Sequence, residues 1–192
     1  MINIFEEGTF GYDLEFFKDQ HIEAIELKDD SSRASVLVIP AYQGRVMTSS
    51  ADGPDGKSFG WINYDCIRSG EINKQFNPFG GEERFWPGPE GGPFSIYFDE
   101  GREQSFANWR VPAEIDTLAF DVSNRAATQC SFRKEFEILN ASGTGLNIGM
   151  EWTVVFIPYN EDAGTNAGKV VEDDYFGKVP SDRLIVKNGT LL

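Results

Sequence analysis

Two long segments in the last third of the chain alternate between apolar and polar residues. Residues 128–139 place apolar side chains on one parity, with Lys134 as the exception, and residues 146–157 repeat the pattern. A period of two is that of a β-strand with one buried face. A Gly/Ser/Asn loop joins the segments, so we predict neighbouring antiparallel strands. The predicted core face carries Cys130, Phe132, Phe136, Ile138, Leu146, Ile148, Met150, Trp152, Val154 and Phe156.

The first fifty residues predict one short helix followed by strands. A helical pattern opens at Thr9 and runs to about residue 20, with Leu14 and Phe17 on one apolar face. Strands are predicted at residues 25–28, 36–39 and 45–51. A loop with strong turn chemistry follows at residues 52–56. These patterns predict a mainly β, antiparallel fold with a short N-terminal helix.

The middle of the chain, residues 57–112, is less regular and holds every Trp except Trp152. Its best strand pattern is at residues 93–98.

The last residues predict an unfinished hairpin. The apolar run 184–186 leads into Asn188-Gly189, and Asn-Gly between apolar runs is a strong hairpin signal. The partner strand would begin at Thr190, two residues before the sequence stops. We therefore expect residues 1–192 to form a single domain that is a fragment of a longer protein.

Charge and composition exclude several classes of partner. The 192 residues carry 17 Lys and Arg against 31 Asp and Glu, a net charge of −14, with no compensating basic cluster. Such a surface repels phosphate backbones and anionic lipids, so we expect neither nucleic acid nor membrane as a partner. The N-terminus lacks the pattern of a signal peptide, which slightly favours the cytoplasm. The oligomeric state stays open.

Two residue types limit the chemistry. Cys66 and Cys130 are far apart and belong to no Cys/His cluster, so we expect no metal and no cofactor; two reduced thiols are favoured over a disulfide. His21 is the only histidine. Residues 56–60 match G-x-S-x-G, but no histidine follows Ser58 to complete a triad, so we interpret the match as a loop.

The segment of residues 79–92 is the most informative for function. It mixes Gly and Pro, which fix backbone shape, with carboxylates, a guanidinium and an indole. Carboxylates and Arg suit the paired hydroxyls of a sugar, and an aromatic face suits its C–H side. The candidate ligand-binding residues are Glu82, Arg84, Trp86 and Glu90, with Arg45 and Trp109 expected nearby.

Two alternatives stand beside a sugar-binding site. In the first, the segment is a rigid loop packed by Phe85 and Trp86, with Arg84 in a structural ion pair, and the protein is a non-catalytic structural or assembly module. In the second, the protein is an enzyme in which a pair such as Glu82 and Glu90 acts as acid and base on a glycoside.

The same segments carry a family resemblance. Residues 38–49 (VIPAYQGRVMTS) resemble the early hairpin of galactose mutarotase-like proteins. Residues 80–92 (GGEERFWPGPEGG) are similar to the glycine-rich, sugar-side segment of a bacterial branch of that superfamily without an assigned activity. With residues 61–64 and 109–113, the resemblance covers most of residues 8–157. It implies an antiparallel β-supersandwich, of which residues 1–192 are the N-terminal, incomplete part, and a small sugar as ligand.

The chain departs from the superfamily's catalytic pattern. Aldose 1-epimerases use histidines in the middle of the chain and a glutamate base near its C-terminus. Residues 154–160 lie where a histidine is expected and contain none, and the position of the base falls beyond Leu192. The resemblance therefore implies carbohydrate binding or processing and transfers no epimerase residue, so catalytic residues stay unassigned.

Overall fold

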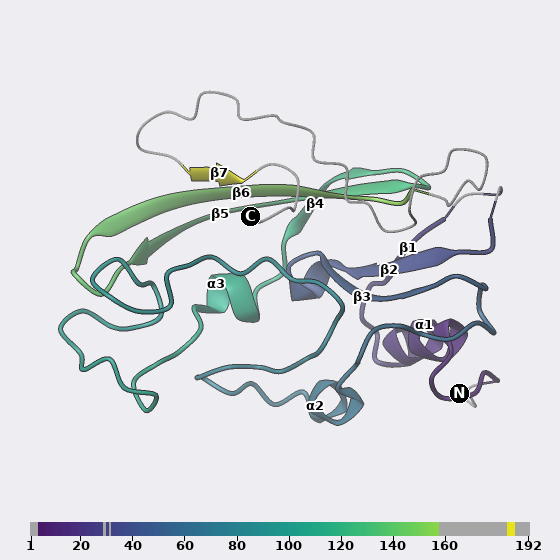
Figure 1. The fold of residues 1–192 in the computed structure, drawn as a ribbon, viewed down its shortest axis with the longest axis horizontal. Coiled ribbons are helices and arrows are strands. Elements are labelled where there is room, and N and C mark those ends of the chain that lie inside the picture. The colour runs from purple at the N-terminus through teal and green to yellow at the C-terminus, as the bar shows by residue number, and fades with distance from the viewer. Residues whose placement is uncertain (1–3, 29, 31, 158–183, 187–192) are drawn as a thin grey trace.

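The computed structural model describes residues 4–28, 30, 32–157 and 184–186, which form short helices and two sheets (Figure 1). The elements in chain order are α1 (Phe10–Asp19), β1 (Ile25–Leu27), β2 (Ser35–Ile39), the 3-10 helix η1 (Pro40–Tyr42), β3 (Arg45–Ser50), α2 (Tyr64–Ser69), α3 (Ala113–Asp116), β4 (Asp121–Arg125), β5 (Gln129–Leu139), β6 (Gly145–Val155) and β7 (Leu184–Val186). The prediction of a mainly β fold with a short N-terminal helix is confirmed.

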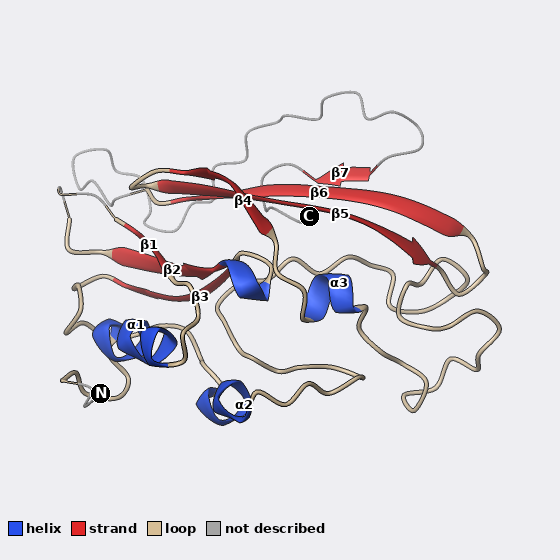
Figure 2. Cartoon of the chain, turned by 180° about the vertical axis from the view of Figure 1, so that it is seen from behind, coloured by secondary structure: helices blue, strands red, loops and turns tan. Residues whose placement is uncertain are grey.

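The two sheets are stacked, and the N-terminal helix covers the outer face of the smaller one. Strand order is β1-β2-β3 in the small sheet and β4-β5-β6-β7 in the large one. All pairings are antiparallel except that of β7 with β6, which is parallel. Figures 1 and 2 show α1 on the side of the small sheet that faces away from the β5–β6 hairpin.

Alternation along β2 explains the apolar run at residues 36–39. Val38 packs toward the large sheet in the cluster that contains Phe132 and Trp152. Leu37 and Ile39 pack on the other side, in the cluster that contains Phe17 of α1. The small sheet is therefore buried on both faces, which is why its central strand reads as a continuous apolar run.

Thr9, where the sequence predicts the helical pattern to open, is the N-cap of α1. The Thr9 side chain accepts a hydrogen bond from the backbone N–H of Tyr12 at 3.4 Å, which satisfies one of the free N–H groups of the first turn. Phe10 and Phe17 are fully buried against the small sheet.

The long hairpin is the best-predicted element. Residues 129–139 and 145–155 pair antiparallel in one continuous register, with Phe132 opposite Trp152 and Phe136 opposite Ile148. Of the ten predicted core residues, the buried ones are Cys130, Phe132, Met150, Trp152 and Phe156, and the half-buried ones are Phe136, Ile138, Leu146, Ile148 and Val154. The four residues nearest the hairpin turn are half-buried because loops, rather than the small sheet, lie beneath that end (Figure 1).

The prediction of a strand at residues 93–98 is wrong. The segment forms turns, in which the Ser95 N–H donates to the carbonyl of Gly92 and the Tyr97 N–H donates to Ser95 Oγ. Residues 95–98 are all buried. The apolar run therefore signals burial rather than a strand.

The sequence analysis did not predict strand β4. All of its residues are exposed, so no apolar alternation marks it, and it is recognisable only by its pairing with β5. Strand β7 coincides with the apolar run 184–186, whereas the hairpin predicted at residues 187–192 lies outside the described residues. Among the described residues, no helix has the length and apolar character needed to cross a bilayer.

Candidate functional site

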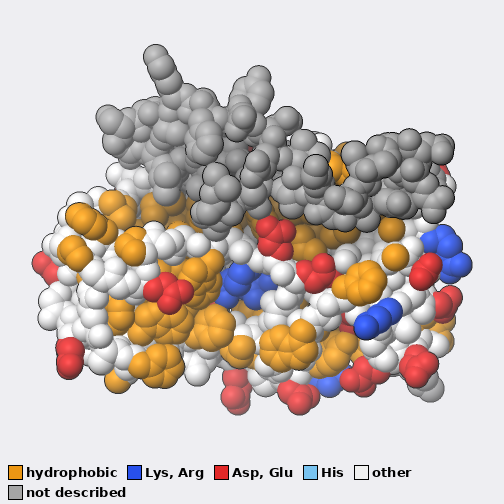
Figure 3. All heavy atoms as spheres, viewed as in Figure 1, with side chains coloured by type: hydrophobic (Ala, Val, Ile, Leu, Met, Phe, Trp, Pro, Cys, Tyr) orange, Lys and Arg blue, Asp and Glu red, His pale blue; other side chains and the backbone are white. Residues whose placement is uncertain are grey.

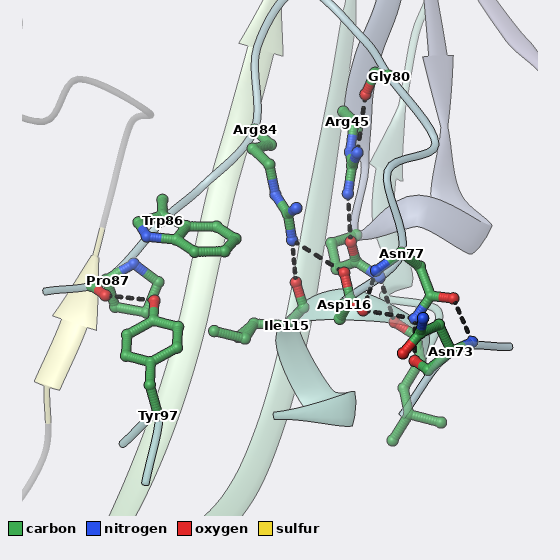
Figure 4. Close-up of polar contacts among 12 residues, drawn as sticks. Arg45, Asn73, Asn77, Gly80, Arg84, Trp86, Pro87, Tyr97, Ile115 and Asp116 are labelled. Atoms are coloured by element: carbon green, nitrogen blue, oxygen red, sulfur yellow. Dashed lines mark hydrogen bonds and ion pairs between the residues drawn. The ribbon is translucent and has the colours of Figure 1, made fainter. Parts of the chain in front are cut away.

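Arg84 and Asp116 connect the predicted site segment to α3. Arg84 Nη2 donates to the backbone carbonyl of Ile115 at 2.7 Å and lies 3.5 Å from Asp116 Oδ1 (Figure 4). The Asp116 side chain is 3% exposed and that of Arg84 is 19% exposed. Asp116 Oδ2 also accepts two hydrogen bonds from Asn77, at 3.0 Å from the backbone N–H and 2.7 Å from Nδ2. Arg84 thus takes part in the structural ion pair that the alternative interpretation predicts.

Arg45 lies behind this pair and is only 2% exposed. Its Nη1 donates to the carbonyl of Gly80 at 2.8 Å, and its Nη2 donates to Gln43 Oε1 at 3.2 Å. Burial and the nearby positive charge of Arg84 lower the pKa of Arg45 to about 9, while Asp116 opposes that shift. Burial likewise lowers the pKa of Arg84. Both guanidinium groups remain charged at neutral pH.

Four aromatic rings beside Arg84 form a cluster, which we call the ring ladder: Trp86, Tyr97, Trp109 and Phe106. Trp86, Tyr97 and Trp109 are all in mutual contact, with the Trp86 and Trp109 centroids 6.4 Å apart, and Phe106 stacks on Trp109. Successive centroids are 5.4, 5.9 and 6.1 Å apart, and successive planes differ by 24°, 7° and 12°. Such offset stacking is favourable beyond the area it buries.

The two ends of the ring ladder differ in exposure. At the inner end, the Arg84 guanidinium carbon lies 4.4 Å from the Trp86 ring centroid, and Figure 4 shows Trp86 between Arg84 and Tyr97. The hydroxyl of Tyr97 donates to the carbonyl of Pro87 at 2.6 Å, and burial raises its pKa. At the outer end, Phe106 is 78% exposed. Phe106 is therefore the exposed ring of the ladder, whereas Trp86 and Trp109 are both half-buried.

Glu90 is the carboxylate that accompanies the ring ladder. The indole Nε1 of Trp86 donates to Glu90 Oε1 at 2.6 Å, and Glu90 itself is exposed. Figure 3 shows a broad hydrophobic area, dotted with acidic groups, over the loops between α2 and α3. An exposed carboxylate on a half-buried indole is a combination that can bind a polar ligand with an apolar face.

Glu82 makes its contacts elsewhere. Its carboxylate accepts hydrogen bonds from Ser49 Oγ of β3, at 2.9 and 3.0 Å, and its backbone N–H donates to the carbonyl of Val46. Its neighbour Glu83 has a raised pKa, because it is partly buried and lies beside the charge of Glu82. Of the six predicted site residues, Arg84, Trp86, Glu90 and Trp109 contact the ring ladder or belong to it, Arg45 is buried behind them, and Glu82 binds β3.

A shallow hollow of about 330 Å³ opens next to this cluster. It is lined by Cys66, Ser69, Glu71, Ile72, Asn73, Phe76, Asn77 and Pro78, and by none of the six predicted residues. Phe76 joins the two features, because its ring centroid is 6.1 Å from those of both Trp86 and Trp109. Asn77 joins the hollow to Asp116.

Sequence reasoning missed Phe76, Asn77, Tyr97 and Asp116. Asn77 and Tyr97 lie in segments without a regular pattern, and Asp116 ends a four-residue helix. For Asp116, the one signal in the sequence is an acidic residue in a partly apolar stretch, next to Ile115 and shortly after Val111-Pro112.

A second buried polar cluster ties α1 to the loop after β3. Asp13 is 1% exposed and accepts hydrogen bonds from Ser58 Oγ and from the hydroxyl of Tyr64, and Ser58 Oγ also bonds to Thr48 Oγ1. Burial raises the pKa of Asp13. The G-x-S-x-G serine is therefore held as a loop residue, and its partners connect α1, β3 and α2.

Both cysteines are free thiols, Cys66 half-buried and Cys130 buried, and burial raises the pKa of each. Within the described part of the chain, no group of three or more His, Cys, Asp or Glu side chains is placed to hold a metal ion.

Comparison with protein-family models matches residues 8–155 to a family described as a family of unknown function, DUF6786. The chain belongs to this family. The match runs from just before α1 to the end of β6 and includes all six predicted site residues. No curated protein and no solved structure matches the chain. The part of the chain that matches the family therefore includes the candidate site, and the family description assigns that site no ligand.

Proposed function

We propose that this chain is a carbohydrate-binding or carbohydrate-processing protein of galactose mutarotase-like fold. Two stacked, largely antiparallel sheets with a long hairpin are consistent with a β-supersandwich. The resemblance of residues 38–49 and 80–92 to that superfamily supports the same interpretation.

The ring ladder beside Glu90 is the observation that carries the proposal. Four stacked rings fix an aromatic surface whose outer end is exposed, and the C–H face of a pyranose packs on such a surface. Glu90, bonded to the Trp86 indole, supplies an exposed acceptor for sugar hydroxyls in the same cluster. Arg84 and Asp116 hold the segment that carries Trp86 and Glu90, so the polar groups are positioned before a ligand arrives.

Saturation-transfer NMR against a panel of monosaccharides and uronic acids tests this proposal. At least one sugar is expected to receive magnetisation from the protein, with the strongest transfer to the C–H protons of one ring face. Trp109→Ala should weaken that signal. Trp61→Ala is the matched control, because Trp61 is 63% exposed and lies before α2, outside the ring ladder. A panel without any bound sugar overturns the proposal.

A structural or assembly module is the second candidate, and exposed aromatic residues favour it. Phe94, Phe106 and Trp61 are 70%, 78% and 63% exposed, and exposed apolar area is typical of surfaces that contact other proteins. Analytical ultracentrifugation at rising concentration tests this candidate. Self-association that Phe106→Ser abolishes, together with no sugar binding, favours the module over the sugar-binding protein.

The carboxylate-pair enzyme remains a prediction. Glu82 and Glu90 are held by different partners, Ser49 and Trp86. Release of a product from a glycoside during the same NMR experiment tests it, with Glu90→Gln as the variant that should abolish release.

A further inference from the structure

The hollow beside the ring ladder has walls that are fixed by hydrogen bonds. It lies between the end of α2 and the loop that follows, and its volume is about 330 Å³. On one wall, Ser69 Oγ donates to the carbonyl of Cys66 at 2.8 Å and accepts from the N–H of Glu71 at 3.1 Å. On the other wall, Asn77 Oδ1 accepts from the N–H of Asn73 at 2.8 Å, and Asn77 Nδ2 donates to the Asn73 carbonyl at 2.7 Å. A ligand therefore does not have to order these walls when it binds.

The lining of the hollow offers both apolar and polar contacts. Phe76 contributes a half-buried ring, and Ile72 and Pro78 add exposed apolar surface. Among the described residues, no hydrogen bond or ion pair engages the Glu71 carboxylate or the side-chain nitrogen of Asn73. An apolar surface with a free acceptor and a free donor suits a sugar ring. Of the described residues that line the hollow, none is Lys or Arg, and Glu71 carries the one full charge, so a neutral ring suits it better than an anionic one.

One indole connects the hollow to the exposed ring of the ladder. The Trp109 centroid lies 6.1 Å from that of Phe76, which lines the hollow, and 6.1 Å from that of Phe106. Gln75, which precedes Phe76 in the chain, links the same two features, because its Nε2 donates to the Phe106 carbonyl at 2.6 Å. The hollow and the exposed ring of Phe106 therefore adjoin the same tryptophan.

We propose that the ligand is an oligosaccharide of at least two units, with one neutral unit in the hollow and the next packed on the ring ladder at Trp109 and Phe106. This inference rests on the proposed carbohydrate-binding function and names its substrate class. A monosaccharide contacts only one of the two features. Two linked rings gain the second contact without a second loss of translational and rotational freedom, so they should bind more tightly than either ring alone.

The test compares lactose, maltose and cellobiose with their component sugars, D-galactose and D-glucose. Dissociation constants from NMR titration of the wild-type protein should favour at least one disaccharide over both of its components by about tenfold or more.

Cys66 provides an independent readout of the hollow. It lines the hollow and is half-buried, whereas the other free thiol, Cys130, is 0% exposed. Burial raises the pKa of Cys66, so alkylation by iodoacetamide is followed by mass spectrometry at mildly alkaline pH, where more thiolate forms. The disaccharide that binds most tightly should slow the alkylation of Cys66.

Ile72→Ala should reduce both the advantage of the disaccharide and the protection of Cys66 several-fold. Ile157→Ala is the matched control and should change neither, because it removes the same atoms from a residue that does not line the hollow. The two isoleucines are 59% and 53% exposed, so neither substitution opens a cavity in the core.

The outcomes separate the two proposals. Disaccharides that bind no more tightly than their component sugars, or that leave the alkylation of Cys66 unchanged, overturn the oligosaccharide inference and leave carbohydrate binding standing. An advantage that Ile72→Ala does not reduce puts the second unit outside the hollow and overturns the inference as well. No binding of any sugar overturns both proposals.

Discussion

Replacing Asp116 with Asn should destabilise the protein far more than its short side chain suggests. Asp116 is the buried acceptor for Arg84 and for two N–H groups of Asn77. The Asn side chain keeps one acceptor oxygen but turns an NH2 group toward existing donors. Removing one member of a buried ion pair costs about 3–5 kcal/mol, since the remaining charge stays buried. In a chain of this size, 3 kcal/mol corresponds to a fall in Tm of about 6–12 °C.

Asp99→Asn is the matched control for this prediction. Asp99 also pairs with an arginine, Arg110, but the two side chains are 55% and 45% exposed. An exposed pair contributes at most about 1 kcal/mol, although its charged atoms lie closer together than those of Arg84 and Asp116. Urea denaturation followed by circular dichroism measures both variants. Equal losses, or an unchanged free energy of unfolding for Asp116→Asn, refute the view that burial decides the strength of these pairs.

Three further substitutions test other parts of the fold. Gly44→Ala should lower the free energy of unfolding, measured by urea denaturation, by about 1–3 kcal/mol more than Gly70→Ala. Backbone φ is positive at both glycines (67° and 61°), but only at Gly44 would the new Cβ lie within 2.5 Å of a ring, that of Phe132. Equal losses contradict this. Tyr97→Phe removes the hydrogen bond to Pro87 and should lower the free energy of unfolding by about 1 kcal/mol at pH 7. Because burial raises the pKa of Tyr97, the stability advantage of the wild-type protein over this variant should shrink above pH 10. An advantage that grows there contradicts the prediction. Burial also raises the pKa of Asp13. The stability of the wild-type protein relative to Asp13→Asn, followed by thermal melts, should therefore rise as the pH falls from 7 toward 4. A fall in relative stability would show that the buried carboxylate prefers its charged form.

The sequence predicts the elements that carry a clear local pattern. The β5–β6 hairpin follows from alternation, α1 from its opening at Thr9, and the central strand of the small sheet from a continuous apolar run. Strand β4 gives no such signal because every residue of it is exposed, so only its partner β5 defines it. At residues 95–98 the opposite holds: burial is complete, yet local turn bonds through Ser95 replace a ladder.

The candidate site follows from the sequence only in part. Arg84, Trp86 and Glu90 lie in one segment, so local composition points to them together. Their partners Tyr97 and Asp116 come from segments that are brought near by long-range packing, and no spacing rule connects these positions. Glu82 shows the limit of the same reasoning, because its carboxylate bonds to Ser49 of β3 although it lies only two residues before Arg84.

The four tryptophans provide the most direct test of the central claim, that a sugar binds at the outer part of the ring ladder. Trp152 Nε1 donates to the carbonyl of Gln43 inside the core, and Trp61 is exposed outside the ladder, so both serve as internal controls. A ¹⁵N–¹H spectrum of the indole groups should be recorded as lactose is added. We expect the Trp109 signal, and that of Trp86 with its bond to Glu90, to shift in a saturable way while the two controls stay fixed. Four unchanged signals across a panel of neutral and acidic sugars, or a shift of Trp61 alone, would contradict the claim.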